Sequence, residues 1–80
     1  MYCVYVLQDK LGKLYIGYSA NLRNRLVDHA QSRVYTTKRM KDPSIIYFES
    51  YRSKEAAQER EKKLKQFGSA YHGLIKRLHL

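Results

Sequence analysis

The alternation of hydrophobic and polar positions predicts three strands, at residues 2–7, 14–18 and 45–51. All three segments are rich in β-branched and aromatic side chains, a composition typical of strands. The first segment is apolar on both of its alternating faces, so we expect it to be covered on two sides. Asp9 and Gly12 are turn-forming residues between the first two segments, and they predict an antiparallel hairpin.

A helix is predicted directly after the hairpin. Leu22, Leu26 and Ala30 recur at four-residue intervals, which is the spacing of one helix face. Asn21 or Ser19 precedes them, and either side chain can accept a hydrogen bond from the first turn as an N-cap. We therefore expect a short helix with an apolar stripe, ending before the weakly periodic segment that precedes the third strand.

Two further helices are predicted after the third strand. Ser53 is a suitable N-cap, with Glu55 in the first turn, where the helix dipole favours a carboxylate. We expect this helix to run to about Phe67 and to end at Gly68, because glycine is common at helix C-termini. Ser69 then begins a short helix with an apolar stripe. The order β-β-α-β-α-α predicts an α/β protein of the α+β type, with a three-stranded, mainly antiparallel sheet flanked by helices.

Size and composition narrow the class of protein. Eighty residues hold one hydrophobic core, so we expect a single domain over residues 1–80. Sixteen Lys and Arg against seven Asp and Glu give a net charge of +9, which suits polyanionic partners or serves solubility alone. No apolar run could span a bilayer and no signal-peptide pattern is present, so we expect no membrane association. The single Cys3, interpreted as a buried apolar side chain, fits a reducing compartment and a cytoplasmic location.

The segment between the first helix and the third strand is basic and weakly periodic. Interpreted as a loop, it suits contact with a nucleic-acid backbone, with an aromatic side chain available for stacking on a base. A flexible loop that only improves solubility is the alternative interpretation. The candidate nucleic-acid contacts in this segment are Arg33, Tyr35, Lys38, Arg39 and Lys41.

Two of the eight tyrosines do not fit a purely structural role. Tyr5 and Tyr15 can lie on the same face of the sheet if the hairpin register is simple, because side chains alternate strictly along each strand. Gly17, two residues after Tyr15, leaves that face bare. A glycine inside a strand marks either the close approach of a ligand or backbone, or a bulge, and both alternatives stay open. We include Gly17 among the candidate nucleic-acid contacts.

Three titratable or charged side chains on the predicted helices are candidates for phosphate chemistry. Arg25 and His29 lie one helical turn apart and form either a solvated basic face or a phosphate clamp, with His29 able to transfer a proton near neutral pH. Glu61 lies toward the apolar side of its helix. Its carboxylate needs either an ion pair, with Lys65 or an arginine, or a hard divalent cation. Lys65 is also a candidate nucleic-acid contact.

Taken together, these residues resemble the GIY-YIG nuclease superfamily, in particular its small standalone bacterial members and the N-terminal nuclease domain of the DNA-repair excinuclease. The two signature triads of the family correspond to Cys-Val-Tyr at 3–5 and Tyr-Ile-Gly at 15–17, with Cys and Val replacing Gly and Ile in the first. Residues 19–29 look like the family's first helix, and residues 53–65 look like its second. The resemblance covers nearly the whole chain, with short motifs in the family's order.

The resemblance implies a metal-dependent endonuclease that hydrolyses DNA phosphodiester bonds by in-line attack of water. It implies a catalytic arginine at Arg25, a metal-binding glutamate at Glu61, and positions for Tyr5, Tyr15 and His29 around the water and the phosphate. Tyr5 and His29 compete for the role of general base, and the sequence leaves this choice open. The implied cofactor is Mg²⁺, for which Mn²⁺ can substitute.

The small size leaves little surface for reading base sequence. We therefore expect low sequence specificity on DNA that is single-stranded, branched or duplex, as in DNA repair. A non-catalytic nucleic-acid-binding module, or a subunit of a DNA repair complex, is the alternative interpretation. A nuclease that needs a protein partner for targeting is a third hypothesis.

Overall fold

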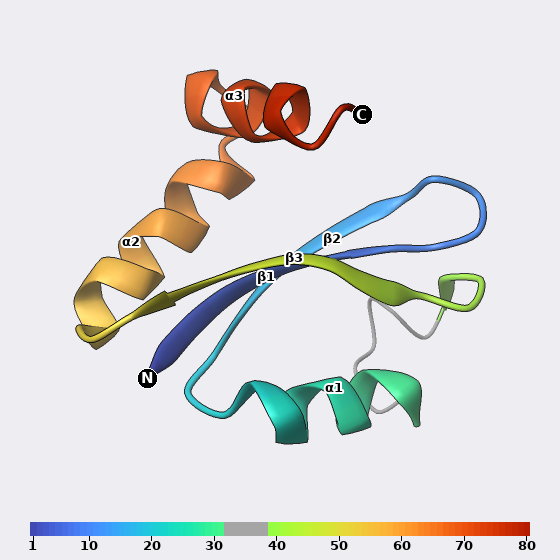
Figure 1. The fold of residues 1–80 in the computed structure, drawn as a ribbon, viewed down its shortest axis with the longest axis horizontal. Helices are drawn as coiled ribbons and strands as arrows, with labels where there is room; N and C mark the ends of the chain where they lie inside the picture. The colour runs from blue at the N-terminus through green and yellow to red at the C-terminus, as the bar shows by residue number, and fades with distance from the viewer. Residues whose placement is uncertain (32–38) are drawn as a thin grey trace.

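The chain folds into a three-stranded antiparallel sheet with helices on both of its faces (Figure 1). The structure is a computed structural model and describes residues 1–31 and 39–80. Its elements are β1 (Tyr2–Gln8), β2 (Leu14–Ser19), α1 (Leu22–Ala30), β3 (Ser44–Tyr51), α2 (Lys54–Lys65) and α3 (Ser69–Arg77). This order confirms the predicted β-β-α-β-α-α arrangement and the α+β class.

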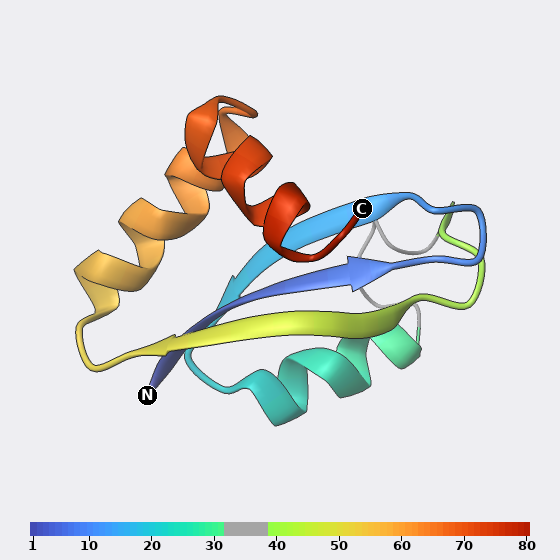
Figure 2. The same cartoon turned by 45° about the horizontal axis from the view of Figure 1, so that its top comes forward.

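Strand β1 lies in the middle of the sheet, between β2 and β3, and pairs antiparallel with both (Figure 2). Residues 3–7 of β1 are buried, as expected for a strand that is apolar on both faces. The pairing with β2 is regular over its whole length, whereas the pairing with β3 shifts between Val6 and Leu7. The regular hairpin determines which side chains of β1 and β2 share a face.

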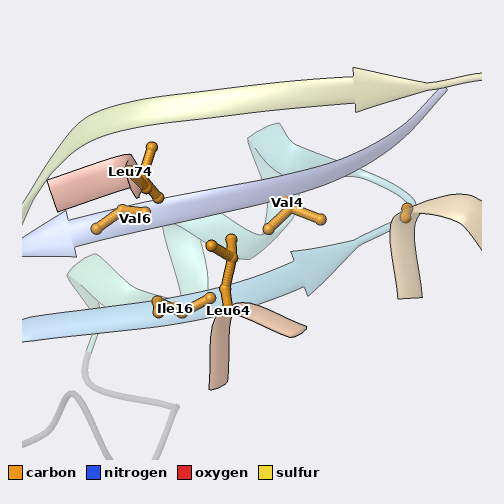
Figure 3. Packing of buried hydrophobic residues seen from close by; sticks show 6 residues of the cluster. Val4, Val6, Ile16, Leu64 and Leu74 are labelled. Atoms are coloured by element: carbon orange, nitrogen blue, oxygen red, sulfur yellow. The ribbon is translucent and has the colours of Figure 1, made fainter. Parts of the chain in front are cut away.

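One face of the sheet packs against α2 and α3 and forms the hydrophobic core (Figure 3). Leu64 of α2 and Leu74 of α3 pack onto it, and full burial of such a side chain contributes about 1.5–3 kcal/mol. Partly buried tyrosines pack against the rim of this cluster, among them Tyr47, Tyr51 and Tyr71. The buried cluster consists of Val4, Val6, Ile16, Ala57, Leu64 and Leu74.

A polar contact also joins β3 to α2. Arg60 Nε donates to Glu49 Oε1 at 2.8 Å, and the Tyr51 hydroxyl donates to Glu49 Oε2 at 3.1 Å. Hydrogen bonding to Glu49 raises the pKa of Arg60. Sequence patterns did not predict this pair, because its two members come from different elements and meet only in the folded chain.

Helix α1 covers the opposite face of the sheet, and its buried side differs from the expected one (Figures 1 and 2). Leu22 and Leu26 are only half-buried, and Ala30 is exposed. The buried side chain of this helix is that of His29. A polar side chain can take this place because it finds a hydrogen-bond partner on the sheet, described below.

The predicted N-caps of two helices are confirmed, whereas the predicted C-terminal end of one helix is wrong. Asn21 caps α1 and Ser53 caps α2 through their side-chain oxygens. The predicted end of α2 at Gly68 is wrong, since the left-handed residue after α2 is Phe67, with φ of 56°, and Gly68 is the N-cap of α3. The chain turns earlier because the Phe67 N–H donates to the Leu64 carbonyl at 3.2 Å. No described helix is long and apolar enough to cross a membrane.

Asp9 holds the hairpin turn and the segment before β3 together. Its buried carboxylate accepts from the N–H groups of Leu11 and Lys13 at 2.9 and 2.8 Å, and from that of Lys41 at 3.2 Å. Burial alone would raise the pKa of the Asp9 carboxyl, but these backbone N–H groups outweigh it and hold that pKa below its ordinary value. The ionised carboxylate therefore fixes the place from which the chain enters β3.

Candidate active site

Tyr5 and Tyr15 lie on the face of the sheet that α1 covers. The register pairs Tyr5 with Gly17 and Leu7 with Tyr15, so both tyrosines share one face, as predicted for a simple hairpin. Their ring centroids are 6.2 Å apart. His29 meets both rings edge-on, with its centroid 5.5 Å from that of Tyr5 and 5.0 Å from that of Tyr15. These three rings are termed the Tyr–His cluster below.

A short buried hydrogen bond joins two members of this cluster. The Tyr5 hydroxyl and His29 Nε2 are 2.6 Å apart, and both side chains are buried. Burial raises the pKa of Tyr5 to about 12, despite the opposing effect of Arg25. Burial, followed by the charge of Arg25, lowers the pKa of His29 below its ordinary 6.5. Near neutral pH the phenol is therefore protonated and the imidazole neutral, and in the tautomer that carries its proton on Nδ1 the Tyr5 hydroxyl donates to His29 Nε2.

Arg25 lies beside the Tyr–His cluster. Hydrogen bonding to the Tyr5 hydroxyl, and more weakly to Tyr15, raises the pKa of the Arg25 guanidinium, which stays charged. The side chain is half-buried, and its Nε–H is buried with no hydrogen-bond partner within residues 1–31 and 39–80. A buried donor without an acceptor costs free energy, and a phosphate oxygen is an acceptor of matching charge.

Gly17 is the residue that makes room for Tyr5. A Cβ at this position would lie 2.4 Å from both Cζ and Oη of Tyr5 and 2.9 Å from Cε1 of Tyr15. The bulge alternative is wrong, because β1 and β2 pair without a register shift. The close approach that requires a glycine is that of the Tyr5 phenol. Gly17 itself is buried, and its contact with nucleic acid stays a prediction.

We expect Gly17→Ala to destabilise the fold, because the added methyl group must displace a fully buried ring or bend β2. Overpacking of this kind costs about 1–3 kcal/mol. Urea unfolding followed by circular dichroism measures the change, with Gly73→Ala in α3 as the control, since a Cβ there meets nothing within 4 Å. An unfolding midpoint for Gly17→Ala equal to that of Gly73→Ala would contradict the role assigned to this glycine.

Glu61 belongs to α2, which covers the face opposite to the Tyr–His cluster. Its side chain is 22% exposed and forms an ion pair with Lys65 one helical turn away, at 3.1 Å. Within the described parts of the chain, no group of three or more His, Cys, Asp or Glu could hold a metal ion. One half-buried carboxylate nevertheless fits Mg²⁺, which accepts one or two protein carboxylates and takes its other ligands from water and phosphate.

A cleft of about 560 Å³ runs along β2, which is an edge strand, and side chains from both faces of the sheet line it. Tyr15 of the Tyr–His cluster lines it, and so does Lys65, the ion-pair partner of Glu61. Phe67, between α2 and α3, and Tyr71 of α3 complete an aromatic wall. Sequence patterns gave Phe67 no role beyond ending a helix, although a large apolar residue at the end of a charged helix is a signal of a further contact.

Most of the predicted nucleic-acid contacts come from the segment that precedes β3. Arg39 and Lys41 are exposed there, close to the place that Asp9 fixes. Lys65 has a half-exposed side chain at the cleft. The remaining candidates lie outside the described residues and stay predictions: Arg33, Tyr35 and Lys38.

The order of strands and helices, with two tyrosines and a histidine gathered on one sheet face beside an arginine, defines a small α+β domain with a clustered polar site. A family model described as the GIY-YIG catalytic domain matches residues 1–72. The chain therefore belongs to the GIY-YIG family, which confirms the resemblance found in the sequence. Nucleases of this family generally use divalent metal ions, and the family implies a nucleic-acid substrate.

The fold is also similar to a solved structure. The solution NMR structure of the UPF0213 protein BH0048 from Bacillus halodurans matches with a TM-score of 0.60 and 25% sequence identity. The match covers 98% of this chain and 85% of that one. No curated protein sequence matches the chain. The structural match supports the arrangement of the sheet and the three helices.

Proposed function

We propose that this protein is a divalent-metal-dependent endonuclease that hydrolyses phosphodiester bonds of DNA. One observation carries the proposal: the buried hydrogen bond from Tyr5 to a neutral His29 lies beside the Arg25 guanidinium, whose Nε–H has no acceptor in the described chain. A proton acceptor and an anion-binding group thus meet on one face of the sheet. Both groups accelerate the hydrolysis of a phosphodiester by water.

Arg25 is the group that binds the phosphate. Its charge is permanent, and its planar guanidinium matches the oxygens of a phosphate in a two-pronged way. The negative charge on the phosphate oxygens grows as water attacks, so a cation held in place by Tyr5 and Tyr15 stabilises the transition state more than the ground state.

Tyr5 and His29 act together as the base. As the water oxygen bonds to phosphorus, the water gives a proton to the Tyr5 oxygen while the Tyr5 proton moves to His29 Nε2. The bond from phosphorus to the leaving oxygen breaks, and that oxygen takes a proton from solvent. A pKa of about 12 disfavours a free Tyr5 phenolate, which favours a relay to His29 over Tyr5 acting alone as the base. Tyr15 positions the water and the phosphate at the mouth of the cleft.

Glu61 is the residue that would hold the metal, and Mg²⁺, or Mn²⁺ in its place, supplies neutralisation of charge on the leaving side when bound. Its carboxylate oxygen is a hard ligand of the kind these ions prefer. In the absence of a cation, the ion pair with Lys65 satisfies the half-buried charge. The same lysine becomes available for a phosphate when the carboxylate binds a cation.

A nuclease assay tests this proposal. End-labelled single-stranded, branched and duplex DNA is incubated with the protein in Mg²⁺, in Mn²⁺ and in EDTA. We expect cleavage with either ion and none with EDTA. Glu61→Gln should raise the Mg²⁺ concentration required for half-maximal cleavage by at least roughly tenfold, because it removes the charged ligand while preserving side-chain size.

Glu59→Gln is the matched control for this assay. Glu59 lies on the same helix and forms the corresponding ion pair with Lys63 at 3.6 Å, but its side chain is 68% exposed. It should show the wild-type Mg²⁺ requirement. Equal requirements in the two variants, or cleavage that persists in EDTA, would overturn the metal assignment. Binding of every substrate without any cleavage would favour a non-catalytic nucleic-acid-binding module.

A further inference from the structure

The cleft along β2 contains an exposed aromatic ring that the proposed chemistry does not use. Phe67 is 60% exposed, whereas Tyr71 beside it is half-buried and packs against the core. The two rings meet edge to face with centroids 4.9 Å apart. A large part of the Phe67 ring is thus accessible on the wall of a cleft, where it contributes little to the core.

The backbone at Phe67 makes the placement of this ring unusual. Its φ of 56° lies in the left-handed region, which bulky residues rarely adopt. A phenylalanine therefore occupies a backbone conformation that favours glycine. Backbone outliers of this kind cluster at sites that bind ligands.

The surroundings of the ring suit a polyanion that carries an aromatic group. Lys65 lines the same cleft and supplies a positive charge beside the ring. Tyr15 connects the cleft to the Tyr–His cluster, since it lines the first and contacts His29 in the second. An apolar peptide would not make use of this charge, whereas a nucleotide combines a flat base with a phosphate.

We propose that the cleft binds one unpaired nucleobase of the DNA substrate, which stacks on Phe67 while Lys65 contacts a neighbouring phosphate. The inference rests on the proposed function and specifies its substrate class. A base inside a duplex is stacked on its neighbours and cannot enter a cleft, so the nucleotide next to the attacked phosphate has to be unpaired or flipped out. The site therefore favours single-stranded or branched DNA over an intact duplex.

A binding experiment in EDTA tests the stacking site without requiring cleavage. Short single-stranded oligonucleotides carry 2-aminopurine, whose fluorescence falls when it stacks. We expect Phe67→Ala to weaken binding by about 5- to 150-fold, the range for loss of one base–aromatic stack, and Phe67→Tyr to retain it. Phe67→Gly should behave like Phe67→Ala while fitting the left-handed backbone, which separates loss of the ring from loss of the fold.

Two controls make the result specific to the ring and to a base. Phe48 on β3 is 57% exposed and lies outside the cleft, so Phe48→Ala should bind like the wild type. In a series of oligonucleotides with one abasic site at successive positions, one position should weaken wild-type binding as much as Phe67→Ala does. At that position the variant should lose nothing further, because the stack is already absent.

Three results would overturn the stacking site. The first is equal binding by Phe67→Ala, Phe48→Ala and the wild type. The second is a series of abasic oligonucleotides in which wild type binds more tightly than Phe67→Ala by the same factor at every position. The third is a solution mass above the 9.5 kDa of one chain that Phe67→Ala reduces, since the ring would then serve self-association. These binding measurements do not require cleavage, so they can be made even if the protein proves to have no nuclease activity. The stacking site and the proposed function can therefore be contradicted independently of each other.

Discussion

Replacing Arg25 with alanine should lower the rate of DNA cleavage by about 10²- to 10³-fold while the protein stays folded. The guanidinium is the cation held beside the Tyr5 hydroxyl, and its buried Nε–H lacks an acceptor among the described residues. Its removal takes away charge stabilisation that grows as water attacks the phosphate. Single-turnover cleavage with excess enzyme measures the chemical step, and thermal unfolding verifies the fold.

Two further variants show whether the geometry or only the charge of this residue matters. Arg25→Lys keeps the charge but loses the planar donor pair, so it should recover only a small part of the rate. Arg23→Ala removes an exposed arginine of the same helix, two residues away, and should cleave at nearly the wild-type rate. Equal losses in Arg23→Ala and Arg25→Ala would indicate general attraction of DNA by positive charge instead of a phosphate-binding site.

The strands and the shared face of the two tyrosines could be predicted from sequence because they depend on local rules. Alternation along a strand has a period of two, and a short turn with Asp9 and Gly12 leaves few registers for the hairpin. Tyr5 and Tyr15 followed from these rules alone. Local rules could not decide between the two alternatives at Gly17, because a glycine at a close approach and a glycine in a bulge have the same sequence. Neither alternative named the Tyr5 ring, which is the group that approaches this glycine.

The contacts of the site depend on how separate elements dock, and local patterns do not encode docking. Helical spacing put Leu22, Leu26 and Ala30 on a stripe, yet the helix buries His29, because the Tyr5 hydroxyl offers it a partner across 24 positions of the chain. The prediction for the C-terminal end of α2 was wrong for a related reason. A preference for glycine at helix ends predicted Gly68, whereas the turn is made at Phe67, whose ring lies at the cleft.

The second large effect on the cleavage rate is expected from substitutions in the Tyr5–His29 pair. Tyr5→Phe removes only the hydroxyl through which the water proton reaches His29 Nε2, and the cleavage rate should fall by about 10²- to 10⁴-fold. His29→Gln should have an effect of similar size, since an amide oxygen accepts the Tyr5 hydrogen bond but cannot take up a proton at neutral pH. His79→Gln, at an exposed position, is the control and should leave the rate unchanged.

The pH dependence separates proton transfer from a merely structural role of His29. The imidazole has to be neutral to accept a proton, and its pKa lies below 6.5, so wild-type cleavage should rise as the pH increases through that lower value and level off before pH 7. His29→Gln should lack this step. The same shift affects stability: a lowered folded-state pKa means that the unfolded chain binds the proton more readily, so stability is fully present above about 6.5 and is lost as the pH falls toward the folded-state value. A wild-type profile that His29→Gln reproduces, with only the unfolding midpoint changed, would assign His29 to packing and leave the base unidentified.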